Sequence, residues 1–323
     1  MIASGSIRAA GLLLAAALTT LPAQAQQLDP AKPIRLIVGL AAGGGTDVTA
    51  RLVAQKMSES MKMTVLVENK AGGIFIPALR EATNAAPDGH TLYFISTSSL
   101  ITQPLHPDYP LDIMKLVPVT EVATGPLILA ARNGLGVKTI KELVDLANSK
   151  PGAIKFGAGG GTGSSLYLAT ELLKARTGIK ITIVPYRGAG PALNDMLGDH
   201  IDAMFDAMPV MAVQAKEGKV TPIAVTGDKR SFLLPNVPTI MESGLDYQIA
   251  GWYGLLAPPG TPALIVQKLR DEVAKAVAPK DVVETLASQG MEPRATQPAE
   301  WAKYMASEMA FYTKIIKDAD IKP

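Results

Sequence analysis

From Lys32 onward, short runs rich in β-branched residues alternate with longer segments whose apolar residues recur at helical spacing. This alternation constrains the fold more than any other feature of the chain. A strand, a crossover helix and a further strand pack as a parallel sheet with helices on its faces. In the first third we expect strands at 34–38, 64–68 and 91–95, with a helix over 47–61. The pattern therefore predicts an α/β protein.

The second part of the chain repeats the pattern. Its expected helices and strands alternate in the order helix 139–149, strand 153–156, helix 164–177, strand 181–184, helix 191–197, strand 203–205, helix 209–217 and strand 221–225. A glycine-rich turn follows a strand in each half, and open α/β sheets bind ligands at the carboxyl ends of their strands. We therefore expect two sheets in two lobes that face one another across a cleft. Residues 26–121 would begin lobe 1, residues 122–226 would form lobe 2, and residues 227–323 would return to lobe 1 with C-terminal helices.

The N-terminus is organised like an export signal. Arg8 precedes the apolar run 9–18, and Ala23-Gln24-Ala25 supplies the small residues of a signal-peptidase site. A membrane anchor is the alternative, but the run is much shorter than the roughly 20 residues that span a bilayer. The next residue, Gln26, is not the cysteine that lipid attachment needs. We expect cleavage after Ala25 and a soluble mature chain in a bacterial periplasm.

Composition removes several classes of function. Thirty-one lysines and arginines against 29 acidic residues leave a net charge of +2, which is too small to attract nucleic acid or an anionic membrane. Cysteine is absent and there are three histidines. Thiolate catalysis is therefore excluded, and few of the usual metal-binding side chains are present. The chain has no Gly-x-Ser-x-Gly elbow, and we expect His90, His106 and His200 at the surface. Neither an enzyme nor a bound cofactor or metal is expected.

Two glycine-rich loops are the main candidates for a ligand site. They contain Ala42, Gly43, Gly44, Thr46 and Asp47 in the first half, and Gly160, Gly161, Thr162, Gly163, Ser164 and Ser165 in the second. Glycines let backbone N–H groups approach a ligand, and the helix N-terminus that follows favours an anion. The alternative for the first loop is a tight turn with Asp47 as an ordinary helix cap. Neither loop has the lysine or the spacing of a nucleotide-binding motif, so we expect a carboxylate or phosphate ligand.

Further candidates lie near expected strand ends. Ser98 belongs to a polar run that follows a strand, and Arg187 could pair with a carboxylate or lie in solvent. Asp202 and Asp206 are four residues apart, so a strand places both on one face. An acid there could accept a bond from a ligand or support a helix cap. For Trp252-Tyr253-Gly254 we favour core packing over a lid.

A series of short motifs occurs in a fixed order along the mature chain. The motifs are Gly43-Gly44-Gly45-Thr46-Asp47 with Arg51, Val67-Glu68-Asn69-Lys70, Ala86-Pro87-Asp88-Gly89, Val184-Pro185-Tyr186-Arg187-Gly188, Leu234-Pro235-Asn236-Val237-Pro238-Thr239-Ile240, Trp252-Tyr253-Gly254-Leu255 and Ala257-Pro258-Pro259-Gly260-Thr261-Pro262. With this series the chain resembles, from about residue 32 to its C-terminus, the Bug-type extracytoplasmic solute receptors. These receptors are the binding components of tripartite tricarboxylate transporters.

The resemblance implies a two-lobed type II periplasmic binding protein that closes around a small carboxylate. The binding loops of such receptors map onto 43–47 and 160–165, and an acid of the second lobe maps onto Asp206, where it can meet a ligand amine or water. The implied partners are the permease subunits of the transporter, and we expect a monomer that binds no nucleic acid. A periplasmic receptor for a sensor kinase and an exported hydrolase are the alternatives.

Two positions depart from the family pattern and bear on the ligand. Ile74-Phe75-Ile76 stands where family members more often place small and polar residues, and Tyr167 stands where the family often has histidine. Apolar and aromatic surface near the cleft favours an aromatic or medium-chain carboxylate. If these side chains pack into the core of lobe 1 instead, a C4–C6 di- or tricarboxylate fits as well. Phe75 and Tyr167 are therefore candidate ligand contacts.

Overall fold

The structure is a computed structural model that describes residues 27–323, so the expected signal peptide and its cleavage after Ala25 lie outside the described residues. The strands are β1 (Ile34–Val38), β2 (Val65–Asn69), β3 (Thr91–Ser96), β4 (Val117–Arg132), β5 (Lys155–Gly159), β6 (Thr182–Tyr186), β7 (Ala203–Ala207), β8 (Val220–Val225), β9 (Ala250–Ala257) and β10 (Glu292–Pro293). The α-helices are α1 (Gly45–Met61), α2 (Ile76–Asn84), α3 (Thr97–Leu105), α4 (Ile140–Ser149), α5 (Ser165–Thr177), α6 (Ala189–Leu197), α7 (Met208–Lys216), α8 (Ala263–Val277), α9 (Lys280–Ser288) and α10 (Pro298–Asp318). The α/β class predicted from the sequence is confirmed.

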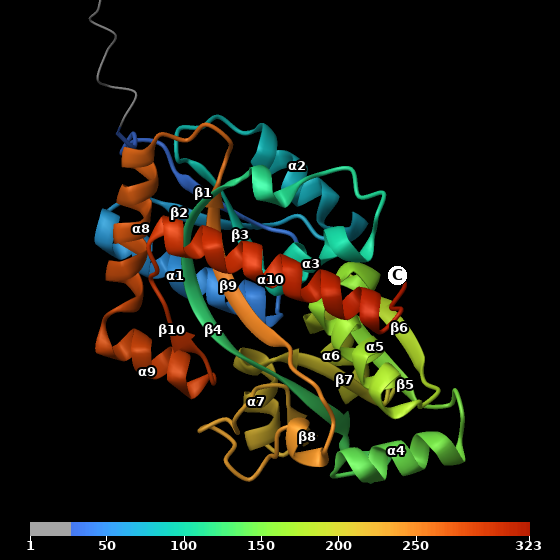
Figure 1. Ribbon diagram of the computed structural model, residues 1–323. Helices are drawn as coiled ribbons and strands as arrows, with labels where there is room; N and C mark the ends of the chain where they lie inside the picture. Colours follow the sequence, from blue (N-terminus) through green and yellow to red (C-terminus); the bar gives the residue numbers. More distant parts are fainter. Residues whose placement is uncertain (1–26) are drawn as a thin grey trace, which may run out of the picture.

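The strands are arranged as two lobes joined through one long strand (Figure 1). Across the described part of the chain the strand order is β2-β1-β3-β9-β4-β7-β5-β6, with β8 and β10 paired to β4. The parallel strands β1, β2 and β3 build the first lobe, and the parallel strands β5, β6 and β7 build the second. The two sheets expected from the sequence are joined into one, because β4 and β9 add antiparallel pairs that link the parallel strands of the two lobes.

Strand β4 changes partners part-way along its length. Residues from Val117 to Pro126 pair with β9, whereas Leu127 to Ala131 pair with β7. Figure 1 shows β4 and β9 passing side by side from one lobe to the other. This change, between Pro126 and Leu127, lies close to the expected lobe boundary between residues 121 and 122. The lobe limits of 26–121, 122–226 and 227–323 stay a prediction.

The burial of β1 in the core explains why this strand could be predicted from the sequence. Ile34, Leu36, Ile37 and Val38 of β1 are all fully buried, because helices cover both faces of this part of the sheet. Helix α10 lies across the first lobe, and its Trp301 meets Trp252 of β9 edge to face with ring centroids 5.1 Å apart.

The helices described in residues 27–323 include none with both the length and the apolar character that crossing a membrane requires.

Two of the three histidines are not exposed at the surface, where the sequence suggested them: His106 is half-buried and His90 is buried. His90 is 3% exposed rather than at the surface. Its Nε2 accepts a hydrogen bond from the Asp29 amide at 3.1 Å, and its Nδ1 lies 3.3 Å from the Pro33 carbonyl oxygen. The imidazole therefore ties the start of the described chain to the first lobe. His200 is exposed, as expected.

Candidate functional site

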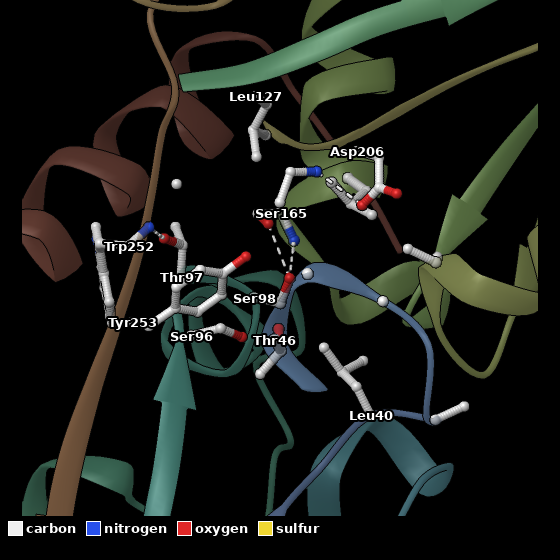
Figure 2. Close-up of a pocket in the computed structure, with 18 residues that line it drawn as sticks. Leu40, Thr46, Ser96, Thr97, Ser98, Leu127, Ser165, Asp206, Trp252 and Tyr253 are labelled. Atoms are coloured by element: carbon white, nitrogen blue, oxygen red, sulfur yellow. Dashed lines mark hydrogen bonds between the residues drawn. The ribbon is translucent and has the colours of Figure 1, made fainter. Parts of the chain in front are cut away.

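A buried pocket of about 40 Å³ lies between the two lobes. Its lining residues are Leu40, Ala41, Gly44, Gly45, Thr46, Ser96, Thr97, Ser98, Leu127, Gly159, Ser165, Leu166, Ala189, Asp206, Ala207, Gly251, Trp252 and Tyr253 (Figure 2). Since a buried water occupies about 10–15 Å³ by this measure, the space suffices for about three waters. A dicarboxylate is larger, so its binding requires the lobes to part by more than they do here.

Five helices begin at this pocket. Helices α1, α3, α5 and α6 contribute their first residues to its lining, and Ala207, directly before α7, also lines it. The first N–H groups of a helix have no partner within the helix, and each N-terminus carries about half a positive charge. Lysine, arginine and histidine are missing from the lining as far as residues 27–323 define it. Positive potential in the pocket therefore comes from the backbone.

Hydrogen bonds hold the two lobes together over the pocket. The hydroxyls of Ser98 and Ser165 lie 2.8 Å apart, and the Ser165 amide donates to Ser98 Oγ at 3.1 Å. Figure 2 shows these bonds at the centre of the pocket. Nearby, Thr102 donates its hydroxyl to the Gly163 carbonyl oxygen at 2.7 Å. Because Ser98 and Thr102 belong to α3 and their partners to the second lobe, these bonds stabilise the closed arrangement.

The aromatic wall of the pocket is held from behind by the C-terminal helix. Trp252 donates its indole N–H to Glu308 of α10 at 2.8 Å, and its amide donates to Thr97 Oγ1 at 3.0 Å. Trp252 is fully buried, so the prediction of core packing is confirmed. The sequence did not show that Trp252 and Tyr253 also line the pocket.

Asp206 is the acidic side chain of the pocket. It stands at the end of β7, is 1% exposed, and its Oδ1 accepts a hydrogen bond from the Ala207 amide at 2.7 Å. Burial raises the pKa of this carboxyl to about 7, and the Ala207 hydrogen bond offsets part of that effect. Asp202, its expected companion, turns away and pairs with Arg132 at 2.9 Å. The acid at this site therefore changes charge near neutral pH.

Two polar atoms at the pocket have no hydrogen-bond partner among the described residues. They are Asp206 Oδ2 and Ser96 Oγ, and both are buried. Most buried polar groups in proteins are hydrogen-bonded, so such atoms call for a ligand or a water as a partner. Together with the five helix N-termini, they give the pocket both donors and acceptors.

The structure places the sequence candidates in three groups. The candidates that line the pocket are Gly44, Thr46, Ser98, Ser165 and Asp206. Those that line a separate hollow of about 410 Å³, outside the pocket, are Phe75, Gly160, Gly161, Thr162 and Arg187. Those that line neither are Ala42, Gly43, Asp47, Gly163, Ser164 and Tyr167. Ligand contact by any of them stays a prediction.

The Asp47 side chain holds the first glycine-rich loop in place through hydrogen bonds. Its carboxylate accepts hydrogen bonds from the Gly43 amide at 3.1 Å, from Arg51 at 3.0 Å and from Asn69 at 3.0 Å. Burial raises the pKa of Asp47, but the bonds from Arg51, Gly43 and Asn69 outweigh it and the net pKa is lowered. Helix α1 is capped by Gly44, so Asp47 acts from its first turn rather than as the cap.

Phe75 and Tyr167 both point into packing contacts. Phe75 is 2% exposed, and a Cβ on Gly39 would stand 2.7 Å from its ring. Tyr167 donates its hydroxyl to the Lys322 carbonyl oxygen at 2.6 Å, which links α5 of the second lobe to the C-terminal tail. Ser164 caps α5 by accepting a hydrogen bond from the Tyr167 amide at 3.1 Å. Neither Phe75 nor Tyr167 therefore lines the pocket, and its aromatic lining residues are Trp252 and Tyr253 instead.

Several lining residues were not found from the sequence. Ala189 follows β6 and Ala207 is the last residue of β7, so the strand-end argument that identified Ser98 applies to both. Leu127 and Gly251 lie in β4 and β9, which no sequence pattern predicted. Within residues 27–323, no three histidine, aspartate or glutamate side chains are grouped to hold a metal ion.

Comparison with known proteins identifies the family. The sequence model described as "Tripartite tricarboxylate transporter family receptor" matches residues 49–321. The chain belongs to this receptor family. The resemblance to Bug-type receptors seen in the sequence is thereby confirmed, and so is a solute-binding role, since members of the family are periplasmic solute-binding proteins.

Solved structures of similar proteins share the whole fold of this receptor. The periplasmic binding protein BugD is 29% identical, with a TM-score of 0.86 over 91% of this chain and 99% of its own. MatC from Rhodopseudomonas palustris with bound malate is 29% identical, with a TM-score of 0.85 over 89% of this chain and 100% of its own. Rpa4515 of R. palustris with adipate is 31% identical, with a TM-score of 0.86 over 91% and 99%. The two-lobed periplasmic binding protein fold is confirmed.

Proposed function

We propose that this receptor captures a short dicarboxylate in the periplasm and delivers it to the permease subunits of a tripartite tricarboxylate transporter. The observation that carries the proposal is the convergence of five helix N-termini on one buried pocket. An anion is the ligand that such an arrangement favours, because the first N–H groups of a helix have no partner within the helix and its peptide dipoles are aligned.

The polar atoms of the pocket favour a short acid that bears hydroxyl groups. The side chains of Thr46, Ser96, Ser98 and Ser165 bring hydroxyls to the lining, and Asp206 adds an acceptor or, when protonated, a donor. A ligand hydroxyl that finds such partners does not pay a desolvation penalty. A C4 acid such as malate matches this chemistry, and malate is the ligand bound to the similar MatC.

The aromatic or medium-chain alternative has less support. Phe75, which suggested it, is buried and lines the outer hollow, not the pocket. The adipate in Rpa4515 shows that a similar receptor holds a C6 acid. A C6 acid in this chain would need space beyond the pocket, and the adjoining space is the outer hollow.

Titration calorimetry on the chain that begins at Gln26 tests the ligand class. We expect malate and succinate to bind at least about tenfold more tightly than benzoate or terephthalate, with adipate and citrate between them. The variant Ser165→Ala, which removes a hydroxyl from the centre of the pocket, should weaken malate more than it weakens benzoate. Tighter binding of the aromatic acids, or no binding of any acid by folded protein, would contradict the proposal.

Delivery to a permease needs a separate measurement. A bacterial strain that lacks this receptor is expected to lose high-affinity uptake of labelled malate, and the wild-type gene should restore it. A control gene that encodes Ser165→Ala should restore less uptake, in proportion to its weaker binding. Unchanged uptake in the deletion strain, with malate binding intact in the purified protein, would refute delivery and leave capture standing.

A further inference from the structure

Leu40 separates the pocket from the outer hollow. The pocket of about 40 Å³ and the hollow of about 410 Å³ have one lining residue in common among residues 27–323, and that residue is Leu40. In Figure 2 its side chain lies on the side of the pocket away from Trp252. The two spaces therefore meet at a single aliphatic side chain.

The contacts of Leu40 span the cleft. It follows β1 in the first lobe, where its carbonyl oxygen accepts a hydrogen bond from Asn69 Nδ2 at 2.9 Å. Its Cδ2 lies 3.0 Å from the point where a Cβ on Gly160 would stand, so its side chain packs on the glycine loop of the second lobe. The next residue, Ala41, donates its amide to the Arg187 carbonyl oxygen at 3.3 Å. Contacts to both lobes thus hold Leu40 and Ala41 in place.

The outer hollow has the size and the lining of a ligand subsite. A volume of about 410 Å³ falls within the 300–1,000 Å³ that small-molecule sites usually have. Ile74 and Phe75 give it an apolar side, and the exposed Arg187 contributes to the opposite lobe's side. A guanidinium can bind a carboxylate through two parallel hydrogen bonds. The hollow suits the far end of an elongated diacid.

We propose that Leu40 sets the length of the acid that this receptor accepts. The inference rests on the proposed function, because it assumes that one carboxylate of the ligand sits at the helix N-termini of the pocket. With Leu40 in place, its side chain stands between the pocket and the hollow, so a longer chain meets it on the way toward Arg187. Without its γ- and δ-carbons, the pocket and the hollow become one elongated site.

The test compares Leu40→Ala with a matched control. Leu127→Ala removes the same carbons from the same pocket, but Leu127 does not line the hollow. Calorimetric titrations would use the straight-chain diacids succinate, glutarate, adipate, pimelate and suberate. For Leu40→Ala we expect the affinity for suberate relative to succinate to rise at least about tenfold, and for Leu127→Ala to change by less than about twofold. Thermal melting verifies that each variant is folded.

Two further measurements sharpen the assignment. Leu40→Phe places a larger side chain between the pocket and the hollow. We therefore expect the affinity for adipate relative to succinate to fall, which is the opposite of the change expected for Leu40→Ala. In the Leu40→Ala background, suberate should bind more tightly than octanoate, which has the same length and one carboxylate. The additional change Arg187→Gln should remove that preference.

The outcomes distinguish the two claims. Wild-type protein that binds succinate while Leu40→Ala and Leu40→Phe leave the order of the diacids unchanged overturns the length filter alone. An equal shift in Leu127→Ala also overturns it, because a larger pocket would then explain the effect. Folded wild-type protein that binds none of the diacids overturns the proposed function, and the filter with it.

Discussion

Replacing Asp206 by asparagine tests whether a buried carboxyl at the pocket is protonated near neutral pH. The side chain is 1% exposed and accepts one hydrogen bond, from the Ala207 amide. Burial raises its pKa from the ordinary value of 3.8 to about 7. Asparagine has nearly the same shape but does not titrate, so the variant isolates the free energy associated with this one proton.

The sign follows from proton binding in the folded and unfolded states. Between pH 3.8 and about 7 the folded protein holds a proton on Asp206 that the unfolded chain has lost. The stability that this raised pKa contributes is therefore fully present below pH 3.8 and is lost as the pH rises toward 7. At 1.36 kcal/mol for each pH unit between the two values, the loss is about 4 kcal/mol.

The assay is urea denaturation of wild type and Asp206→Asn at a series of pH values from about 4 to about 8. We expect the unfolding free energy of the variant, minus that of wild type, to rise by about 4 kcal/mol over this range. A constant offset of about 1–3 kcal/mol against the variant is also expected, because its amide N–H₂ is left buried without a partner. The offset does not change with pH and so does not obscure the result.

Asp202→Asn is the matched control from the same segment. Asp202 pairs with Arg132 at 2.9 Å, so its replacement breaks an ion pair and should lower the unfolding free energy at pH 8. Parallel pH curves for wild type and Asp206→Asn would refute the reasoning. They would mean that Asp206 is ionised in the folded protein throughout this range, and that the pocket solvates its charge.

Two other predictions concern the N-terminus of α1 at the pocket and processing. Gly45→Ala would place a Cβ 2.6 Å from Tyr253 Oη and 2.7 Å from the Ala207 Cβ, so the first turn of α1 cannot keep its place at the pocket and malate affinity should fall at least about tenfold by calorimetry. Gly44→Ala meets its nearest neighbour at 3.4 Å, an ordinary contact, and should lose less; an equal loss would show that this crowding is not the cause. N-terminal sequencing of exported protein is expected to begin at Gln26, and a product that retains Met1 would contradict cleavage after Ala25.

Strands β1 and β3 could be predicted from the sequence because burial on two faces leaves a run of apolar residues. β1 is such a run, and its predicted limits coincide with the observed ones. β9 could not be predicted, because its two glycines read as turn signals. Gly254 is a glycine for a tertiary reason, since a Cβ there would stand 2.4 Å from the Trp301 ring. β4 contains Pro118 and Pro126, which also argued against a strand.

For the candidate site, the sequence located strand ends but not the directions of the loops that follow them. That argument found Ser98, Ser165 and Asp206, which do line the pocket. It could not show that Asp47 turns inward to hold the Gly43 amide, because Asn69 and Arg51 complete that arrangement from other elements. It also could not show that the Phe75 ring is buried against Gly39, because that contact depends on the absence of a side chain on another segment.

The change of partners along β4 has a consequence for how the molecule comes apart. Removing this strand would take a central member out of the sheet of each lobe, so neither half retains a complete hydrogen-bonded ladder by itself. Two lobes on separate sheets would melt in two steps, whereas lobes that share a strand lose their pairing together. Heating should therefore give one cooperative transition, in which the calorimetric enthalpy equals the van't Hoff enthalpy. The strand that joins the lobes also makes them a single unit of folding.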